Sequence, residues 1–167
     1  MGMDPFFVSQ IVLLLILIFL SAFFSGSETA LYAIERTTLL RWKRDGSKHQ
    51  KLAARLMDDH HATLIAILIG TNFVNILASV ILNKLTGRVL SGPQSVLIAG
   101  LVATTVIVIF GEVAPKTFAY GRSQSLAPRI APIIRIFCEI LSPVILVIKA
   151  LTGGILRLTG QRGGGKL

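Results

Sequence analysis

Three long apolar stretches, separated by polar segments, dominate the pattern of hydrophobic and polar positions along the chain. They cover about residues 6–34, 62–85 and 94–119, and residues 11–20 carry no polar side chain at all. A helix needs about 20 apolar residues to cross the hydrocarbon core of a bilayer. The pattern therefore predicts an all-α membrane protein with three transmembrane helices. A turn joins the second and third helices and contains Gly87, Gly92 and Pro93.

The first stretch also has the length of a secretory signal peptide, with its short apolar core and small-residue cleavage site. Residues 1–5 lack the basic residues that precede the apolar core of a signal peptide. The segment after Leu20 also contains more polar residues than a cleavage site requires. We therefore favour a transmembrane helix. Residues 1–5 are then a leader or an appended segment, and residues 161–167 form a glycine-rich tail.

The segments outside the spans predict helices at the membrane surface. Residues 35–60 are basic and predict a cytoplasmic helix that rests on anionic headgroups. Residues 126–160 include a last apolar stretch, 136–151, in which a fourth span would bury the Glu139 carboxylate in lipid. We favour juxtamembrane amphipathic helices there. Three prolines are expected to break this region into short pieces: Pro128, Pro132 and Pro143.

Composition agrees with a membrane protein and excludes other classes. Charged residues make up 15% of the 167 residues, against about 25% in soluble domains, and the mean hydropathy is +0.73. An intrinsically disordered protein is excluded, because disorder requires low hydrophobicity. A secreted scaffold held by disulfides is excluded as well, because the single cysteine, Cys138, cannot form an intramolecular disulfide. The sequence has no nucleotide-binding loop, zinc-ligand spacing or catalytic nucleophile motif, so we expect no enzymatic activity.

The net charge of +9 comes from basic residues that lie between the apolar stretches, so it does not call for nucleic acid as a partner. Most of them lie between the first two spans or after the third, and the turn between spans two and three holds only Lys84 and Arg88. Positive charge stays on the cytoplasmic side of a membrane. We expect a multi-pass protein of the cell (inner) membrane, with its N-terminus outside and its C-terminus in the cytoplasm.

Polar residues inside the spans are costly in lipid and therefore indicate function. Ser21 and Ser25 are four residues apart in the first span, and Asn72 and Asn75 are three apart in the second, so each pair shares a helix face. Each pair also has an ordinary explanation. Serines in membrane helices bond back to their own backbone or pack against a neighbour, and an amide can bridge two helices.

The third span contains an isolated carboxylate, Glu112, which must be neutral, paired or bound to a cation. Lys116, four residues on, offers a structural ion pair as an alternative. Pro115 has no N–H for the carbonyl of residue 111, so the Gly111 oxygen is left beside the Glu112 carboxylate as a second possible ligand. The role of Glu28 stays open between charge balance, helix capping and binding of a coupling ion.

Counted along their helices, Ser25, Asn72 and Glu112 all lie about 15 Å from the cytoplasmic boundary, near the middle of the membrane. The candidate ligands are all oxygens, which disfavours soft or borderline metals. Mg²⁺ takes about six oxygens and commonly one or two carboxylates. Na⁺ also suits one carboxylate with neutral oxygens, so composition leaves both ions open.

Three strings resemble the transmembrane domain of the CorC/CNNM (cyclin M-like) magnesium transporter family. They are Ser21-Ala-Phe-Phe-Ser25-Gly-Ser-Glu28-Thr-Ala-Leu, Ile69-Gly-Thr-Asn72-Phe-Val-Asn75-Ile-Leu-Ala-Ser79 and Gly111-Glu112-Val-Ala-Pro115-Lys116-Thr. They occur in the order of the family over about residues 6–125. Thr71 stands where many relatives have a second asparagine.

The resemblance implies a homodimer in the lipid bilayer, with three spans per subunit and a cytoplasmic belt of helices, that exports Mg²⁺ in exchange for Na⁺. The implied Mg²⁺ ligands are Ser21, Ser25, Asn72, Gly111 and Glu112. Residues that support these ligands or bind the coupling ion would be Glu28, Asn75, Pro115 and Lys116. Full-length relatives continue into cytoplasmic CBS domains that bind nucleotide, and we expect these to be absent from this chain.

Two other functions stay open. One is a non-transporting membrane scaffold or Mg²⁺ sensor that regulates another channel. The other is a channel, whose Mg²⁺ flux would not require Na⁺.

Overall fold

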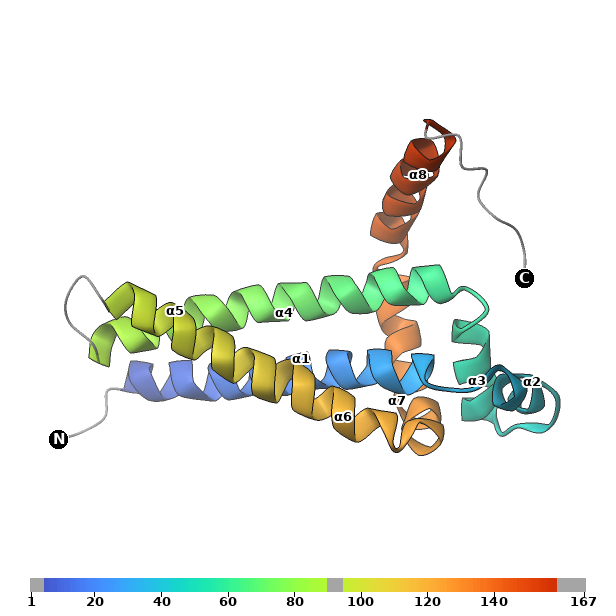
Figure 1. Cartoon of the computed structure of the whole chain (residues 1–167), viewed down its shortest axis with the longest axis horizontal. Coiled ribbons are helices and arrows are strands. Elements are labelled where there is room, and N and C mark those ends of the chain that lie inside the picture. Colours follow the sequence, from blue (N-terminus) through green and yellow to red (C-terminus); the bar gives the residue numbers. More distant parts are fainter. Residues whose placement is uncertain (1–4, 90–94, 159–167) are drawn as a thin grey trace.

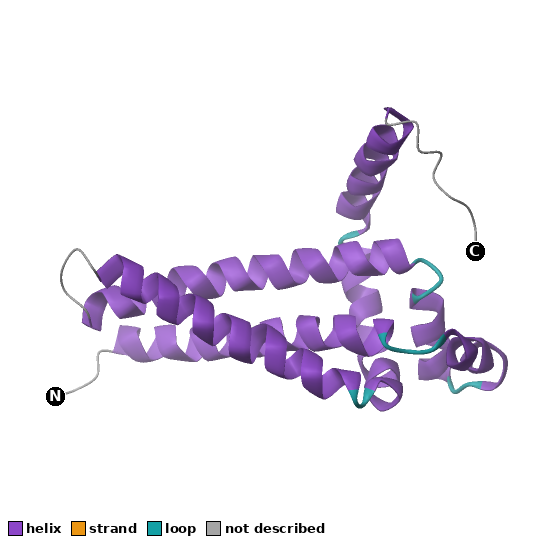
Figure 2. Ribbon diagram, in the orientation of Figure 1, coloured by secondary structure: helices purple, strands orange, loops and turns teal. Residues whose placement is uncertain are grey.

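The computed structural model describes residues 5–89 and 95–158, and all regular structure in these ranges is helical (Figures 1 and 2). The all-α fold expected from the hydropathy pattern is confirmed. The elements in chain order are α1 (Pro5–Tyr32), α2 (Arg36–Asp45), α3 (Lys48–Leu56), α4 (His60–Val89), α5 (Ser95–Val106), the π-helix η1 (Ile107–Val113), α6 (Ala114–Tyr120), α7 (Ser123–Ile140) and α8 (Ser142–Leu158).

Three helical segments of the described residues are long and apolar enough to cross a membrane: Pro5–Tyr32, His60–Gly87 and Gly100–Tyr120. They run side by side along the long axis of the molecule, and the third is a rod made of α5, η1 and α6 (Figure 1). Their outer surfaces carry large exposed apolar side chains, among them Phe19, Leu101 and Phe110. Such a surface is stable against lipid tails. The predicted turn residues Gly92 and Pro93 lie outside the described residues.

The basic segment between the first two spans forms two short helices, α2 and α3, where the sequence predicted a single helix over 35–60. Ser47 begins the second of them with a capping box. Its hydroxyl accepts from the backbone N–H of Gln50, and its own N–H donates to the Gln50 side chain at 2.8 Å. This reciprocal cap favours a new helix start over continuation. Together with α7, these helices lie at one end of the bundle, called the basic end below (Figure 1).

The expectation that three prolines break the last region into short pieces is wrong for two of them. Helix α7 runs through Pro128 and Pro132 without interruption. Each proline removes one backbone hydrogen bond, but the face that carries Ala127, Ala131 and Ile134 is fully buried, and this packing holds the helix. The chain bends by 70° only after Ile140, so the stretch 136–151 forms no straight fourth span.

Helix α8 projects from the bundle and is tied to it by an ion pair (Figure 1). Lys149 donates to both carboxylate oxygens of Asp59, at 2.8 Å and 2.7 Å, just before α4 begins. These hydrogen bonds hold the pKa of Asp59 below its ordinary value. The pair is exposed, so it orients α8 and adds little stability.

Helices α1, α4 and α7 meet at three residues: Phe24, Gly70 and Phe137. The centroids of the two phenylalanine rings are 4.8 Å apart. A Cβ on Gly70 would lie 2.9 Å from the Phe24 ring and 3.0 Å from the Phe137 ring, which is closer than real Cβ contacts. Glycine at position 70 therefore allows α4 to pack directly against this aromatic pair.

We expect Gly70→Val to destabilise the fold by about 1–3 kcal/mol, because the added side chain overpacks this junction. The measurement is thermal unfolding of purified protein in detergent. Gly87→Val is the matched control, since a Cβ at Gly87 meets nothing within 4 Å. An unfolding midpoint for Gly70→Val equal to that of Gly87→Val would contradict the observed packing.

Candidate cation site

Two serines of α1 face the third span and are almost fully buried: Ser21 is 1% exposed and Ser25 is 0% exposed. The Ser21 hydroxyl lies 2.5 Å from Asn75 Oδ1 and 3.3 Å from the Gly111 carbonyl oxygen. The Ser25 hydroxyl donates to the backbone carbonyl of Glu112 at 3.4 Å. Ser27, by contrast, bonds back to Phe23 of its own helix. Ser21 and Ser25 therefore reach across to other helices, and of the two ordinary explanations only contact with a neighbouring helix applies to them.

The third span changes from an α-helix to the π-helix η1 where it meets these serines. The N–H of Ala114 donates to the carbonyl of Ile109, five residues back, as in a π-helix. Pro115 has no N–H, so the Gly111 carbonyl lacks its α-helical donor. Short π-helical segments often coincide with functional sites. In this chain, the segment places the carbonyls of Gly111 and Glu112 against α1.

Gly111 allows this close approach. A Cβ at position 111 would lie 2.8 Å from the Ser21 hydroxyl oxygen and 3.3 Å from the Ser21 Cβ. The hydroxyl of Ser21 carries one proton, and its nearer acceptor is Asn75 at 2.5 Å. The Gly111 oxygen is consequently only a weak acceptor for Ser21 and keeps lone pairs for another partner.

Asn75 of α4 bridges the other two spans, because it bonds to Ser21 of α1 and to the Glu112 carboxylate of η1. Its side-chain oxygen accepts from Ser21, and its side-chain nitrogen donates to Glu112 Oε1 at 2.8 Å. A single amide of α4 thus connects a hydroxyl of α1 with the carboxylate of η1. These contacts join Ser21, Ser25, Asn75, Gly111 and Glu112, which we call the oxygen cluster.

Asn72, one of the expected ligands, lies outside the oxygen cluster. Its residue is exposed, and its side chain makes no hydrogen bond to the described part of the chain. Asn75, expected in a supporting role, takes the position facing Glu112. Residues three apart on an α-helix differ by about 60° in direction, so spacing alone could not choose between the two amides.

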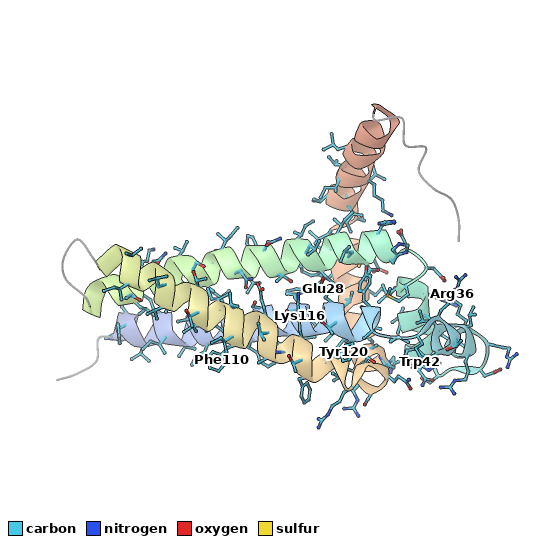
Figure 3. The ribbon with its side chains drawn as sticks, viewed as in Figure 1. Glu28, Arg36, Trp42, Phe110, Lys116 and Tyr120 are labelled. Atoms are coloured by element: carbon cyan, nitrogen blue, oxygen red, sulfur yellow. The ribbon has the colours of Figure 1, made fainter. Side chains whose placement is uncertain are left out.

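Lys116 pairs with Glu28 and not with Glu112. Its ammonium lies 3.2 Å from Glu28 Oε2, between α6 and α1 (Figure 3). Glu28 follows Ser25 by three residues and Lys116 follows Glu112 by four, so the ion pair lies one helical turn from the oxygen cluster. The structure therefore identifies Glu28 as the partner of Lys116, whereas the sequence left open a pair with Glu112.

A cavity of about 410 Å³ lies beside this ion pair. Tyr32 and Tyr120 line it together with Glu28 and Lys116. The sequence reading did not single out the two tyrosines. Each lies four residues after a member of the ion pair, and this spacing could have identified them. The cavity makes the ion pair accessible from outside the bundle.

The chemistry of the oxygen cluster suits a hard cation. The described residues contain no group of three or more His, Cys, Asp or Glu side chains that could hold a metal. The cluster instead combines two hydroxyls, an amide, backbone carbonyls and one carboxylate. Oxygen donors with one carboxylate are typical ligands for Mg²⁺ and also bind Na⁺.

Comparison with known proteins identifies close relatives. The sequence profile of the cyclin M transmembrane N-terminal domain matches residues 12–166. The UPF0053 inner membrane protein YfjD of Escherichia coli (strain K12) is 33% identical over 141 residues, which is 84% of this chain and 33% of that protein. A UPF0053 protein of Haemophilus influenzae is 32% identical over 151 residues, covering 90% of this chain and 36% of the relative. The chain thus spans about a third of the length of these relatives.

We expect Gly111→Ala to destabilise the protein by about 1–3 kcal/mol, because the new methyl group collides with the Ser21 hydroxyl. The penalty should shrink in a Ser21→Ala background, where the nearest atom is removed. Thermal unfolding of purified protein in detergent measures the loss of stability caused by Gly111→Ala in each background. The control is Gly100→Ala, a position where a Cβ meets nothing within 4 Å. Equal penalties in the two backgrounds would contradict the contact.

Proposed function

Because the chain belongs to the cyclin M transmembrane domain family, we propose that it moves Mg²⁺ across the membrane through the oxygen cluster. The observation that carries the proposal is the convergence of oxygens from α1 and η1, seen in the contacts of Ser21 with Gly111 and of Ser25 with Glu112. Mg²⁺ holds its water tightly and requires about six oxygens at about 2.1 Å. A cluster of hydroxyl, carbonyl and carboxylate oxygens can replace those waters.

In the proposed site the Ser21 and Ser25 hydroxyls, the Gly111 carbonyl and the Glu112 carboxylate bind the ion. Glu112 supplies the one formal charge of the set, which makes it the principal source of affinity for a divalent cation. In the structure, the Asn75 side chain forms hydrogen bonds with Glu112 Oε1 and with the Ser21 hydroxyl. The incoming cation would replace these hydrogen bonds, so binding and rearrangement of α4 are coupled.

The proposed fifth protein ligand is Asn72, as the family resemblance implies. It reaches the cluster if α4 turns by about 60° about its axis, which exchanges the Asn75 amide for the Asn72 amide. The same turn takes Asn72 away from the exposed surface, where an amide is unfavourable in lipid. Two positions of α4 around one mid-membrane site provide the alternation that a transporter needs.

The transport we propose is Mg²⁺ export driven by Na⁺ entry, in a homodimer of the cell membrane with the N-terminus outside. The concentration of basic residues at the α2, α3 and α7 end supports a cytoplasmic position for that end. One relative, YfjD of Escherichia coli, is named as an inner membrane protein, which supports a location in the cell membrane. Glu28, paired with Lys116 one turn from the cluster, is the proposed carboxylate for the coupling ion.

Glu112→Gln is expected to reduce Mg²⁺ flux to below 1% of wild type in proteoliposomes that contain a Mg²⁺-sensitive dye. A unit charge at about 4 Å is worth about 4 kcal/mol at an effective dielectric constant of about 20, or about 10³-fold in binding. The matched control is Glu139→Gln, because Glu139 pairs with Arg135 on the exposed surface of α7. Wild-type flux in Glu112→Gln would disprove the assignment of the site.

The same proteoliposomes distinguish the alternatives when flux is measured with and without an opposing Na⁺ gradient. We expect flux only with the gradient, since export of a divalent cation against its gradient needs a driving ion. Equal flux in both conditions would identify a channel. No flux in either condition, from protein that folds normally, would identify a scaffold or sensor.

A further inference from the structure

An apolar groove lies on the outside of the bundle where α1, α6 and α7 meet. Its volume is about 330 Å³, and its lining includes Phe19 and Ala30 of α1, Phe118 of α6 and Leu126 of α7. Ser27 also lines it, but its hydroxyl donates to a carbonyl of its own helix at 2.6 Å. The groove therefore presents no unpaired hydroxyl and suits a hydrocarbon occupant.

The length of the groove matches one leaflet of a bilayer. Its α1 wall runs from Phe19 to Ala30, twelve residues of a membrane-spanning helix, and the eleven steps between them rise by about 16 Å. Half of a hydrocarbon core of about 30 Å is about 15 Å. Since Ser25 lies near the middle of the membrane, the α1 wall starts about 9 Å beyond the middle and runs toward the basic end, where Leu126 and Ile130 of α7 complete the groove. An acyl chain from a headgroup at the basic end can lie along this path.

Two arginines adjoin residues that line the groove at the basic end, Arg122 by contact and Arg129 by its position on α7. The guanidinium carbon of Arg122 is 4.5 Å from the centroid of the Phe118 ring, which lines the groove. Arg129 follows Leu126 by three residues and adjoins Ile130 on α7, and both of these residues also line the groove. The two arginines are exposed, and neither forms an ion pair with a carboxylate in residues 5–89 and 95–158.

We propose that this groove binds one anionic phospholipid, with an acyl chain along α1 and the phosphate on Arg122 and Arg129. Guanidinium groups form paired, charge-assisted hydrogen bonds with phosphate oxygens, and basic pockets at the cytoplasmic ends of membrane helices suit such headgroups. A second copy of the chain or a neutral lipid would fill the groove without using either charge. The proposal does not depend on Mg²⁺ transport.

The bound lipid also touches the rod that carries the oxygen cluster. Pro115, three residues after Glu112, forms part of the groove. A Cβ added to Gly26 would lie 3.5 Å from the Pro115 carbonyl oxygen, so α1 and α6 are already in close contact at this floor. The acyl chain would thus pack on α1, which supplies the serines, and on α6, which directly follows the η1 segment that carries Glu112.

The test is native mass spectrometry of the purified protein, titrated with phosphatidylglycerol or with phosphatidylcholine of the same acyl chains. We expect wild type to prefer phosphatidylglycerol by at least tenfold. Arg122→Gln with Arg129→Gln should lower phosphatidylglycerol affinity by at least tenfold and leave phosphatidylcholine unchanged. The control pair is Lys84→Gln with Arg135→Gln, exposed basic residues that do not line the groove, with an expected change below twofold.

A second variant tests the groove itself. Ala22 lines it, so Ala22→Phe should lower the binding of both lipids by filling space that the acyl chain needs. Equal affinity of wild type for the two lipids, or an equal loss in the Lys84 and Arg135 control pair, would overturn the proposal. So would disulfide cross-linking of two copies through Phe118→Cys in a Cys138→Ser background, because the groove would then be an interface between copies.

Discussion

The close approach of α1 and η1 at Ser21 and Gly111 is the constraint on which the oxygen cluster depends. A Cβ at position 111 would come within 2.8 Å of the Ser21 hydroxyl oxygen and 3.3 Å of the Ser21 Cβ, so glycine at position 111 allows this approach without displacing Ser21. This contact brings Ser25 to the carbonyl of Glu112 and leaves Asn75 to bridge Ser21 and the Glu112 carboxylate. A methyl group at position 111 would press first on Ser21, the α1 residue that Asn75 and Gly111 both contact.

The spans could be predicted from the sequence because a bilayer imposes a length and an apolar composition that local residues satisfy by themselves. Features that depend on packing could not. Pro128 and Pro132 predict breaks from local chemistry, yet burial of Ala127 and Ala131 keeps α7 intact. Likewise, the division of residues 35–60 into two helices depends on one cap at Ser47, which basic composition does not reveal.

The role of Ser21, Ser25, Gly111 and Glu112 as ligands stays a prediction. That these four groups lie together could be predicted from the sequence, because lipid disfavours isolated polar side chains within spans and Pro115 frees the Gly111 carbonyl. The choice between Asn72 and Asn75 could not, since it depends on the rotation of α4. The partner of Lys116 also depends on tertiary structure, because the spacing allows Glu112 whereas the contact with Glu28 joins two helices. Pro115 was the one local indication that the backbone departs from an α-helix at the site.

The most direct test of this account is a crystal structure of the protein soaked with Mn²⁺, which prefers oxygen octahedra as Mg²⁺ does and scatters anomalously. We predict an anomalous peak between α1 and η1, about 2.1–2.3 Å from the Ser21 and Ser25 hydroxyls, the Gly111 carbonyl and the Glu112 carboxylate. A protein that retains its fold but shows no peak there, or a peak only elsewhere, would contradict the central claim that these oxygens form a cation site.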